Sequence, residues 1–209
     1  MRNSGLILIG AGGHCRSCID VIEREGNFRI GGLAGLSQEV GTKIFGYEVL
    51  TTDAGVVELI KTFPYALIAL GQIHSAELRI RLYQELTMKG FRFPTIIAPT
   101  ASVSARATIG AGTIVMHGAV INAGAVIGEN CIINSTALVE HDSRVADHCH
   151  VSTGAILNGG TSVGSGSFIG SGATLREGIS VAENSMVGMG LVVQHDLPAN
   201  SRFRERHTS

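Results

Sequence analysis

The sequence predicts two parts of different fold class: a small Rossmann-like parallel α/β domain over residues 1–98 and a left-handed parallel β-helix over residues 99–198. Residues 199–209 are expected to form a C-terminal tail. Three observations support this division. Strand-like and helix-like runs alternate in the first part, an aliphatic residue recurs every six positions in the second, and no proline interrupts that repeat.

The α/β domain is expected to alternate strands with helices. Strands are expected at residues 6–14, 28–36, 65–71 and 95–98, the first running into a glycine turn. Helices are expected at residues 15–26, 54–63 and 75–90. Gly26 and Gly90 should end the first and last helix, because glycine readily adopts the left-handed conformation found there. Strands that alternate with helices form a parallel sheet.

The second half repeats with a period of six residues. Sixteen consecutive aliphatic residues keep this spacing without a gap: Val103, Ile109, Val115, Ile121, Ile127, Ile133, Val139, Val145, Val151, Leu157, Val163, Ile169, Leu175, Val181, Val187 and Val193. Two positions before each of them the chain is mostly small, as a tight corner requires. This is the hexapeptide signature of a parallel β-helix, in which three units make one coil. The prism should be about 25 Å long at roughly 4.8 Å per coil.

The segment GAGGHC at residues 10–15 follows the first strand and nearly matches G-x-G-x-x-G, with Cys15 in place of the third glycine. Backbone N–H groups at a helix N-terminus favour a phosphate or diphosphate. A dinucleotide needs an acid about 20 residues further on to hold the ribose. Residues 31–36 read GGLAGL and contain none, so NAD is disfavoured and another phosphorylated ligand is favoured. His14 either contacts that ligand or caps the turn.

A cluster of acids and imidazoles centres on His141. In the sixfold register this residue stacks between Ala123 and Gly159, one coil away on either side, so the imidazole has open space beside it. A neutral histidine next to a carboxylate can accept a proton near pH 7. The neighbouring acids are Glu140 and Asp142, and the periodicity does not decide between them. A solvated polar patch on the prism wall is the alternative interpretation.

His150 has different neighbours. It stacks between Ile132 and Phe168 and is framed by apolar surface. Asn134 lies one residue after an inward position and seven before His141. The periodicity assigns neither His150 nor Asn134 a chemical role.

A metal site is a competing interpretation of the same stretch. His141, His148, His150 and Asp147 are ligand types suited to zinc, and one class of carbonic anhydrase uses a β-helix of this kind. The sequence has no pattern that places three histidines at one subunit boundary, so no metal is expected.

Composition disfavours several classes of protein. The formal charge is −1 and like charges do not run together, so neither nucleic-acid nor membrane binding is expected. No apolar run approaches the roughly 18 residues of a membrane span. The start of the chain fits a strand better than a signal peptide, which predicts a cytoplasmic protein. Four scattered cysteines do not suggest a disulfide framework, although Cys15 and Cys18 form a C-x-x-C that suits a redox pair or half a zinc site.

Three motifs carry a family resemblance: GAGGH at residues 10–14, IALG at residues 68–71 and INSTALVEHDSRVADHCHVSTGA at residues 133–155. They resemble the bacterial family of sialic-acid O-acetyltransferases and nucleotide-4-amino-sugar N-acetyltransferases, which are hexapeptide-repeat acyltransferases. The resemblance implies acetyl transfer from acetyl-CoA to a sugar, favouring the amine of a nucleotide-linked 4-amino-sugar, with sialic-acid O-acetylation as the alternative. It also implies a homotrimer with active sites between subunits.

The resemblance also implies roles for individual residues. The catalytic group is His141 as general base, with Asp142, and with Glu140 as the other neighbouring acid. The residues implied to contact acetyl-CoA are His150, Gly159, Ser171 and Asn134. The residues implied to hold the sugar nucleotide are Gly12, Gly13, His14 and Gln72.

Two departures from the family pattern bear on the substrates. Ala34 and Gly35 stand where members commonly carry Asp-Asp, which leaves the carrier open among UDP, GDP, dTDP and CMP. At the C-terminus, Arg202, Arg204 and Arg206 either meet the 3′-phosphate of CoA or form a solvated tail. Two functions from other classes compete with acetyl transfer: a metal-dependent hydratase and a non-catalytic trimer that binds a nucleotide sugar.

Overall fold

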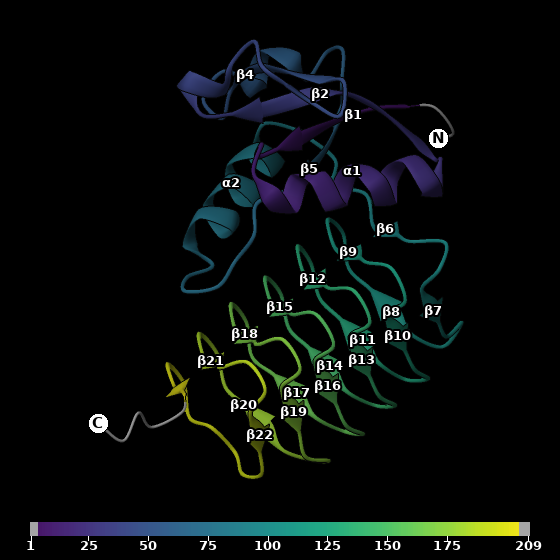
Figure 1. Cartoon of the computed structure of the whole chain (residues 1–209), viewed down its shortest axis with the longest axis vertical. Coiled ribbons are helices and arrows are strands. Elements are labelled where there is room, and N and C mark those ends of the chain that lie inside the picture. The colour runs from purple at the N-terminus through teal and green to yellow at the C-terminus, as the bar shows by residue number, and fades with distance from the viewer. Residues whose placement is uncertain (1–3, 205–209) are drawn as a thin grey trace.

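The computed structural model describes residues 4–204 and has two stacked parts (Figure 1). The α/β domain, purple to blue in Figure 1, lies above a prism of coils that runs from teal to yellow. The fold class predicted from the sequence is confirmed: an α/β domain is followed by parallel strands in three stacked ladders.

The α/β domain is built on a five-stranded sheet of order β3-β4-β2-β1-β5. All neighbours pair in parallel except β3 and β4. Its elements, in chain order, are β1 (Ser4–Ile9), α1 (Gly13–Glu25), β2 (Phe28–Gly35), the 3₁₀ helix η1 (Ser37–Glu39), β3 (Lys43–Ile44), β4 (Tyr47–Thr52), the 3₁₀ helix η2 (Val56–Leu59), β5 (Tyr65–Ile68) and α2 (Glu77–Met88).

The two long helices cover opposite faces of this sheet. Leu6 and Leu8 of β1 pack with α1, while Ile7 and Ile9 pack with α2. Side chains alternate across a strand, so each face of the buried sheet needs its own cover. The expected C-terminus of α1 is confirmed, since Gly26 has φ +72 and donates its N–H to Ile22.

Three expectations for this domain were wrong. The helix expected at residues 54–63 is a single 3₁₀ turn, η2, because Pro64 disfavours helical backbone at Phe63. The Phe63 ring instead fills the space above Gly5 and Gly31, where added Cβ atoms would lie 2.6 and 2.1 Å from it. The hairpin β3–β4 was missed. The strand expected at residues 95–98 belongs to the prism.

The prism contains three ladders of two-residue strands, in which each strand pairs with the one 18 residues further on. Its strands are β6 (Ile96–Ile97), β7 (Ser102–Val103), β8 (Thr108–Ile109), β9 (Ile114–Val115), β10 (Val120–Ile121), β11 (Val126–Ile127), β12 (Ile132–Ile133), β13 (Leu138–Val139), β14 (Arg144–Val145), β15 (His150–Val151), β16 (Ile156–Leu157), β17 (Ser162–Val163), β18 (Phe168–Ile169), β19 (Thr174–Leu175), β20 (Ser180–Val181), β21 (Met186–Val187), β22 (Val192–Val193) and β23 (Arg202–Phe203).

The ladders extend past both limits read from the sequence. β6 pairs with β9 before residue 99, and β23 pairs with β21 inside the expected tail. Both pairs keep the third ladder continuous, so the first and last coils gain backbone hydrogen bonds at their ends.

The repeat predicted the interior of the prism correctly. The inward aliphatic of each strand from β9 to β22 is at most 2% exposed and belongs to one core cluster. Burial of each such side chain stabilises the fold by about 1.5–3 kcal/mol. The corners have left-handed backbone every six residues, mostly at glycine, but four consecutive corners instead carry Asn130, Thr136, Asp142 and His148 at φ +51 to +61. Side chains at such positions cost backbone strain, which marks this region as unusual.

The two parts share a buried interface. Cys15, Cys18 and Ile19 of α1 belong to the same apolar cluster as Ile114 and Ile132, which point outward from the prism. All four cysteines are free and buried. Burial raises the pKa of Cys15 to about 12, so this thiol is protonated at neutral pH. In this structure the C-x-x-C is therefore part of the core, without the reactive thiolate of a redox pair.

Candidate active site

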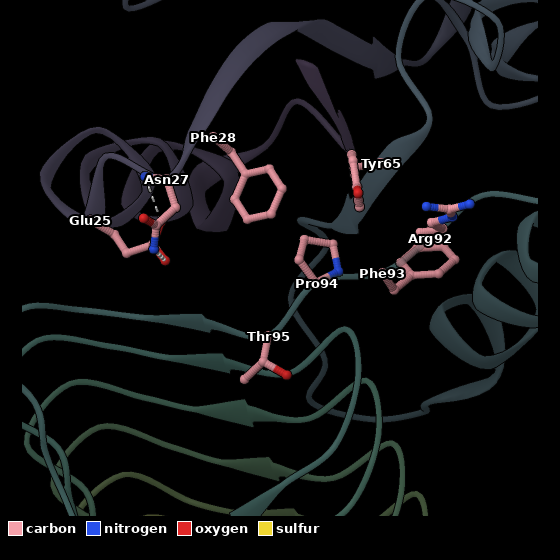
Figure 2. Close-up of a pocket in the computed structure, with 8 residues that line it drawn as sticks. All are labelled: Glu25, Asn27, Phe28, Tyr65, Arg92, Phe93, Pro94 and Thr95. Carbon is pink, nitrogen blue, oxygen red and sulfur yellow. Dashed lines mark hydrogen bonds between the residues drawn. The ribbon is translucent and has the colours of Figure 1, made fainter. Parts of the chain in front are cut away.

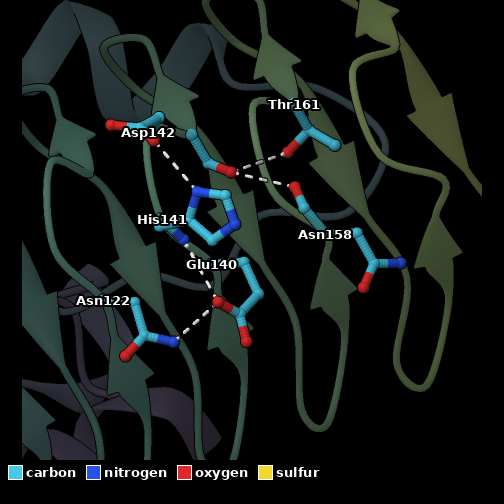
Figure 3. Close-up of polar contacts among 7 residues, drawn as sticks. Asn122, Glu140, His141, Asp142, Asn158 and Thr161 are labelled. Atoms are coloured by element: carbon cyan, nitrogen blue, oxygen red, sulfur yellow. Dashed lines mark hydrogen bonds and ion pairs between the residues drawn. The ribbon is translucent and has the colours of Figure 1, made fainter.

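His141 lies on an exposed corner of the prism between β13 and β14 (Figure 3). Its side chain is 66% exposed, and Nδ1 lies 2.9 Å from Oδ2 of Asp142. A carboxylate only accepts hydrogen bonds, so Nδ1 carries the proton that is donated to Asp142. Nε2 of the neutral ring then keeps a free lone pair. Hydrogen bonding to Asp142 is the main cause that raises the pKa of His141, with the nearby charges of both acids adding to it.

Two glycines make room for this pair. A Cβ added at Gly159 would lie 2.7 Å from His141 Nε2 and 2.8 Å from Cε1, so the ring lies directly over Gly159. A Cβ added at Gly124 would lie 2.5 Å from Oδ1 of Asp142. The stacking of His141 on Gly159 that the 18-residue register predicts is confirmed, and the imidazole stays uncovered.

The two acids beside His141 differ in their contacts. Asp142 bonds the ring, whereas Glu140 Oε2 accepts from Asn122 Nδ2 at 2.9 Å and from the His141 backbone N–H at 3.2 Å (Figure 3). Glu140 therefore anchors the backbone of the corner. In this structure Asp142 is the acid that orients the imidazole, a choice the sequence left open.

His150 is buried on a different ladder of the prism, at 6% exposure. Nδ1 donates to the carbonyl oxygen of Gln72 at 2.6 Å, and Asn134 Nδ2 lies 3.2 Å from Nε2. The ring packs edge-on against Phe168, as the register predicted. Burial lowers the pKa of His150 to about 4, so the ring is neutral at pH 7 and has a single tautomer fixed by the carbonyl.

A groove of about 530 Å³ runs along this ladder. It is mostly apolar, and its lining residues are Ile73, His74, His150, Ser152, Phe168, Gly170, Ser171, Met186, Gly188, Met189, Leu191 and Arg204. Two residues implied to contact acetyl-CoA, His150 and Ser171, therefore lie in one cavity. Asn134 bonds His150 beside it. Gly159 lies under His141 instead.

Sequence reasoning missed the apolar wall of this groove. Phe168 and Met186 follow His150 at intervals of 18 residues, so the register was a signal that could have revealed them. Arg204 also lines the groove, which favours ligand contact over a solvated tail for this residue. Arg202 instead donates to the carbonyl oxygens of Asn184 and Ser201. Arg206 lies outside the described residues.

The glycine loop lies at the carboxyl edge of the sheet, where β1 ends and α1 begins. Gly12 precedes α1 and Gly13 opens it, and nothing lies within 4 Å of a Cβ added at either position. His14 Nε2 is buried and has no hydrogen-bond partner within residues 4–204. Its ring centroid lies 6.5 Å from that of His150. Burial lowers the pKa of His14 to about 3, so it is neutral and connects the loop to the groove.

Gln72 does not point into open space. The residue is 2% exposed, and its Nε2 donates to the carbonyl oxygens of His148 at 3.0 Å and Gly166 at 3.3 Å. Together with its own carbonyl bound to His150, these bonds join the loop after β5 to two coils of the prism. The geometry thus gives Gln72 a structural role at the interface and does not support its predicted contact with substrate.

A second cavity, of about 460 Å³, lies at the opposite edge of the sheet (Figure 2). Its walls include Phe28 and Tyr65, the first residues of β2 and β5, together with Arg92 and Pro94. Ligands of open α/β sheets bind outside the carboxyl ends of the strands. This cavity faces the amino ends and contains none of the predicted site residues.

The three histidines of the metal alternative have separate partners. His141 bonds Asp142, His150 bonds the Gln72 carbonyl, and Nδ1 of His148 lies 3.0 Å from Asn130 Nδ2. Within residues 4–204, no three His, Cys, Asp or Glu side chains form a group that could hold a metal ion. No helix in the described part of the chain has the length and apolar character needed to cross a membrane.

Comparison with protein families assigns both parts of the chain. Residues 5–86 match the PglD N-terminal domain. Residues 106–141 match the bacterial transferase hexapeptide model of six repeats, and residues 160–195 match the hexapeptide repeat of succinyl-transferase. A comparison with curated protein sequences found no match.

Solved structures resemble the whole chain. The acetyltransferase domain of PglB from Neisseria gonorrhoeae in complex with acetyl coenzyme A is 32% identical, with 95% of this chain and 94% of that chain covered and a TM-score of 0.86. PerB from Caulobacter crescentus in complex with CoA and GDP-perosamine is 32% identical over 94% and 91% of the two chains, with a TM-score of 0.87. WeeI from Acinetobacter baumannii, at 21% identity and a TM-score of 0.79, supports the fold alone.

Proposed function

The chain belongs to the bacterial family of sialic-acid O-acetyltransferases and nucleotide-4-amino-sugar N-acetyltransferases and is an acetyl-CoA-dependent sugar acetyltransferase, for which we propose a nucleotide-linked amino sugar as acceptor. The amine is favoured over a hydroxyl because a structure 31% identical to this chain is that of a perosamine N-acetyltransferase in complex with CoA and GDP-perosamine. The observation that carries the chemistry is the exposed His141–Asp142 pair, with Nε2 free above Gly159.

In this proposal His141 is the general base. The sugar amine attacks the carbonyl carbon of the acetyl thioester, and Nε2 takes the proton that the nitrogen loses as its new bond forms. The C–S bond then breaks, and the CoA sulfur leaves with a proton. Asp142 holds the ring in the tautomer that leaves Nε2 free and stabilises the imidazolium that forms, while Glu140 keeps the corner rigid.

Acetyl-CoA occupies the groove along β15, β18 and β21. Phe168, Met186 and Met189 offer apolar surface to the pantetheine chain, while Ser171 adds polar contacts. His150 is neutral, and its protein hydrogen bonds hold the ring in place at the wall of the groove. The α/β domain binds the nucleotide sugar at its glycine loop, through Gly12, Gly13 and His14.

The active site is completed by a second copy of the chain. No residue that lines the groove comes from the corner that holds His141. Within one prism, that corner and the groove lie on different ladders, so the base of one copy must meet acetyl-CoA bound to another. A homotrimer of parallel prisms provides three such sites. The four free thiols are consistent with a reducing compartment, and we place the enzyme in the cytoplasm.

Product analysis tests this function. The purified chain is mixed with acetyl-CoA and a panel of UDP-, GDP- and dTDP-linked 4-amino-sugars, release of the CoA thiol is followed, and the products are identified by mass spectrometry. We expect one amide product for each CoA released, and activity that withstands EDTA. Thiol release without an acetylated sugar, or loss of activity on chelation, would contradict the proposal and favour a hydrolytic or metal-dependent function.

A mixing experiment tests the shared site. Variant His141→Ala lacks the base, and Met186→Asp places a charge in the groove. Each variant alone should be nearly inactive. Dissociation and reassembly of the two together should restore activity, because some sites then combine an intact base with an intact groove. Mixtures that stay as inactive as the parents would show that base and groove belong to the same chain.

A further inference from the structure

The missing acid at the end of β2 is replaced in space by a residue from the following turn. The strand ends in Ala34 and Gly35, neither of which is acidic, but the Glu39 side chain folds back over this point. A Cβ added at Gly35 would lie 2.7 Å from Glu39 Oε2. The carboxylate therefore occupies the space that a side chain at position 35 would fill.

This carboxylate is fixed by the local backbone. Oε2 accepts the Leu36 N–H at 2.7 Å, and the Glu39 N–H donates to the Leu36 carbonyl at 2.9 Å. Within residues 4–204 no donor bonds Oε1, so that oxygen is free to accept hydrogen bonds from a ligand. Because the turn already orders the side chain, binding a ligand there requires little further loss of freedom.

Glu39 also lies at the ligand-binding edge of the sheet. The Gly35 position that it covers is 3.1 Å from the Cβ of Ala11, in the glycine loop. Burial raises the pKa of Cys15 in the first turn of α1, and the negative charge of Glu39 adds to this increase. The carboxylate is thus close to both the glycine loop and the start of α1, where a phosphate would bind.

We propose that Glu39 binds the ribose hydroxyls of the nucleotide carrier and that the carrier is a ribonucleoside diphosphate. In Rossmann-like domains an acid after the second strand accepts hydrogen bonds from ribose hydroxyls while the helix N-terminus holds the phosphates. Glu39 supplies that acid from four positions beyond the strand, and Gly35 leaves room for it. The inference rests on the proposed function and selects UDP or GDP over dTDP, whose sugar lacks the 2′-hydroxyl.

The test compares ribose and 2′-deoxyribose ligands. Binding of GDP, 2′-deoxy-GDP, UDP and 2′-deoxy-UDP is measured by calorimetry for the wild type, Glu39→Gln and the control Glu48→Gln. The glutamine keeps an oxygen for the Leu36 N–H but removes the charge. Glu48 is an exposed acid on the adjacent strand β4. With the nucleotide amino sugar that gives turnover, KM and kcat are measured as well.

A charged hydrogen bond to ribose predicts a roughly 10- to 100-fold preference of the wild type for one ribonucleotide over its deoxy form. Glu39→Gln should lose most of that preference and raise the KM of the nucleotide sugar by a similar factor. The KM of acetyl-CoA should stay within about twofold, and Glu48→Gln should resemble the wild type.

Other results separate the two proposals. Turnover of a nucleotide sugar without ribose preference, or with the preference unchanged in Glu39→Gln, would overturn the role of Glu39 and leave the proposed function standing. Failure of every nucleotide to bind, together with acetylation of free amino sugars, would overturn both the role of Glu39 and the nucleotide-linked acceptor.

Discussion

The contact between His141 and Gly159 allows a small substitution to test the position of the base. Gly159→Ala adds a Cβ that would lie 2.7 Å from Nε2 and 2.8 Å from Cε1. An ordinary contact is at least 3.4 Å, so the ring must retreat by about 0.7 Å or rotate away. Because a misplacement of about 1 Å costs a catalytic group up to roughly 100-fold in rate, we expect kcat to fall by about 30- to 100-fold.

Steady-state kinetics with saturating acetyl-CoA and nucleotide sugar provide the assay. The backbone at Gly159 is not in the left-handed region, so alanine should not strain the fold, and the melting temperature should change by no more than about 2 °C. Glu177→Ala, one coil further on at the same exposed corner, is the matched control and should keep full activity. A Gly159→Ala enzyme with the kcat of the wild type would refute the claim that catalysis requires the ring at this position.

Three further substitutions test other parts of the structure. Asp142→Asn removes the hydrogen bond that raises the pKa of His141, so the base deprotonates at lower pH; the acid limb of kcat/KM should move to lower pH, and kcat should fall less than in His141→Ala. An unmoved limb would assign it to another group. His150→Phe loses the bond to the Gln72 carbonyl and should raise the KM of acetyl-CoA about 10-fold with a smaller effect on kcat, whereas an unchanged KM would place acetyl-CoA elsewhere. Arg79→Met leaves the carbonyl oxygens of Ile68, Leu70 and Asn130 without their buried donor and should lower the free energy of unfolding by about 3 kcal/mol in urea, whereas the exposed Arg81→Met should change it by under about 1 kcal/mol; equal effects would contradict a buried interdomain clamp.

The prism could be predicted in detail because its geometry is local and periodic. Each coil uses 18 residues, so the sequence alone places Gly159 beside His141 and Phe168 beside His150. The same periodicity was insufficient at the ends. Ile96 and Arg202 join the outer ladders although they lie outside the aliphatic repeat, because an unpaired terminal coil gains hydrogen bonds from any chain in reach.

The α/β domain was less predictable because its exceptions depend on distant contacts. Residues 54–63 have a helical pattern, but Pro64 and the packing of Phe63 against two strands limit them to one turn. The position of Glu39 above Gly35 depends on a turn that no spacing rule anticipates. Gln72 had no motif that revealed its bonds to the coils, which exist only once both parts have folded.

The most direct test of the general base is the pair of constants kcat and Kd for His141→Ala. Acetyl-CoA binding is measured by calorimetry, and turnover is measured with both substrates saturating. Loss of the proton acceptor at an exposed corner, away from the groove, predicts a kcat at least about 100-fold below the wild type with an unchanged Kd for acetyl-CoA. A kcat within about threefold of the wild type would contradict the assignment of His141 as the base.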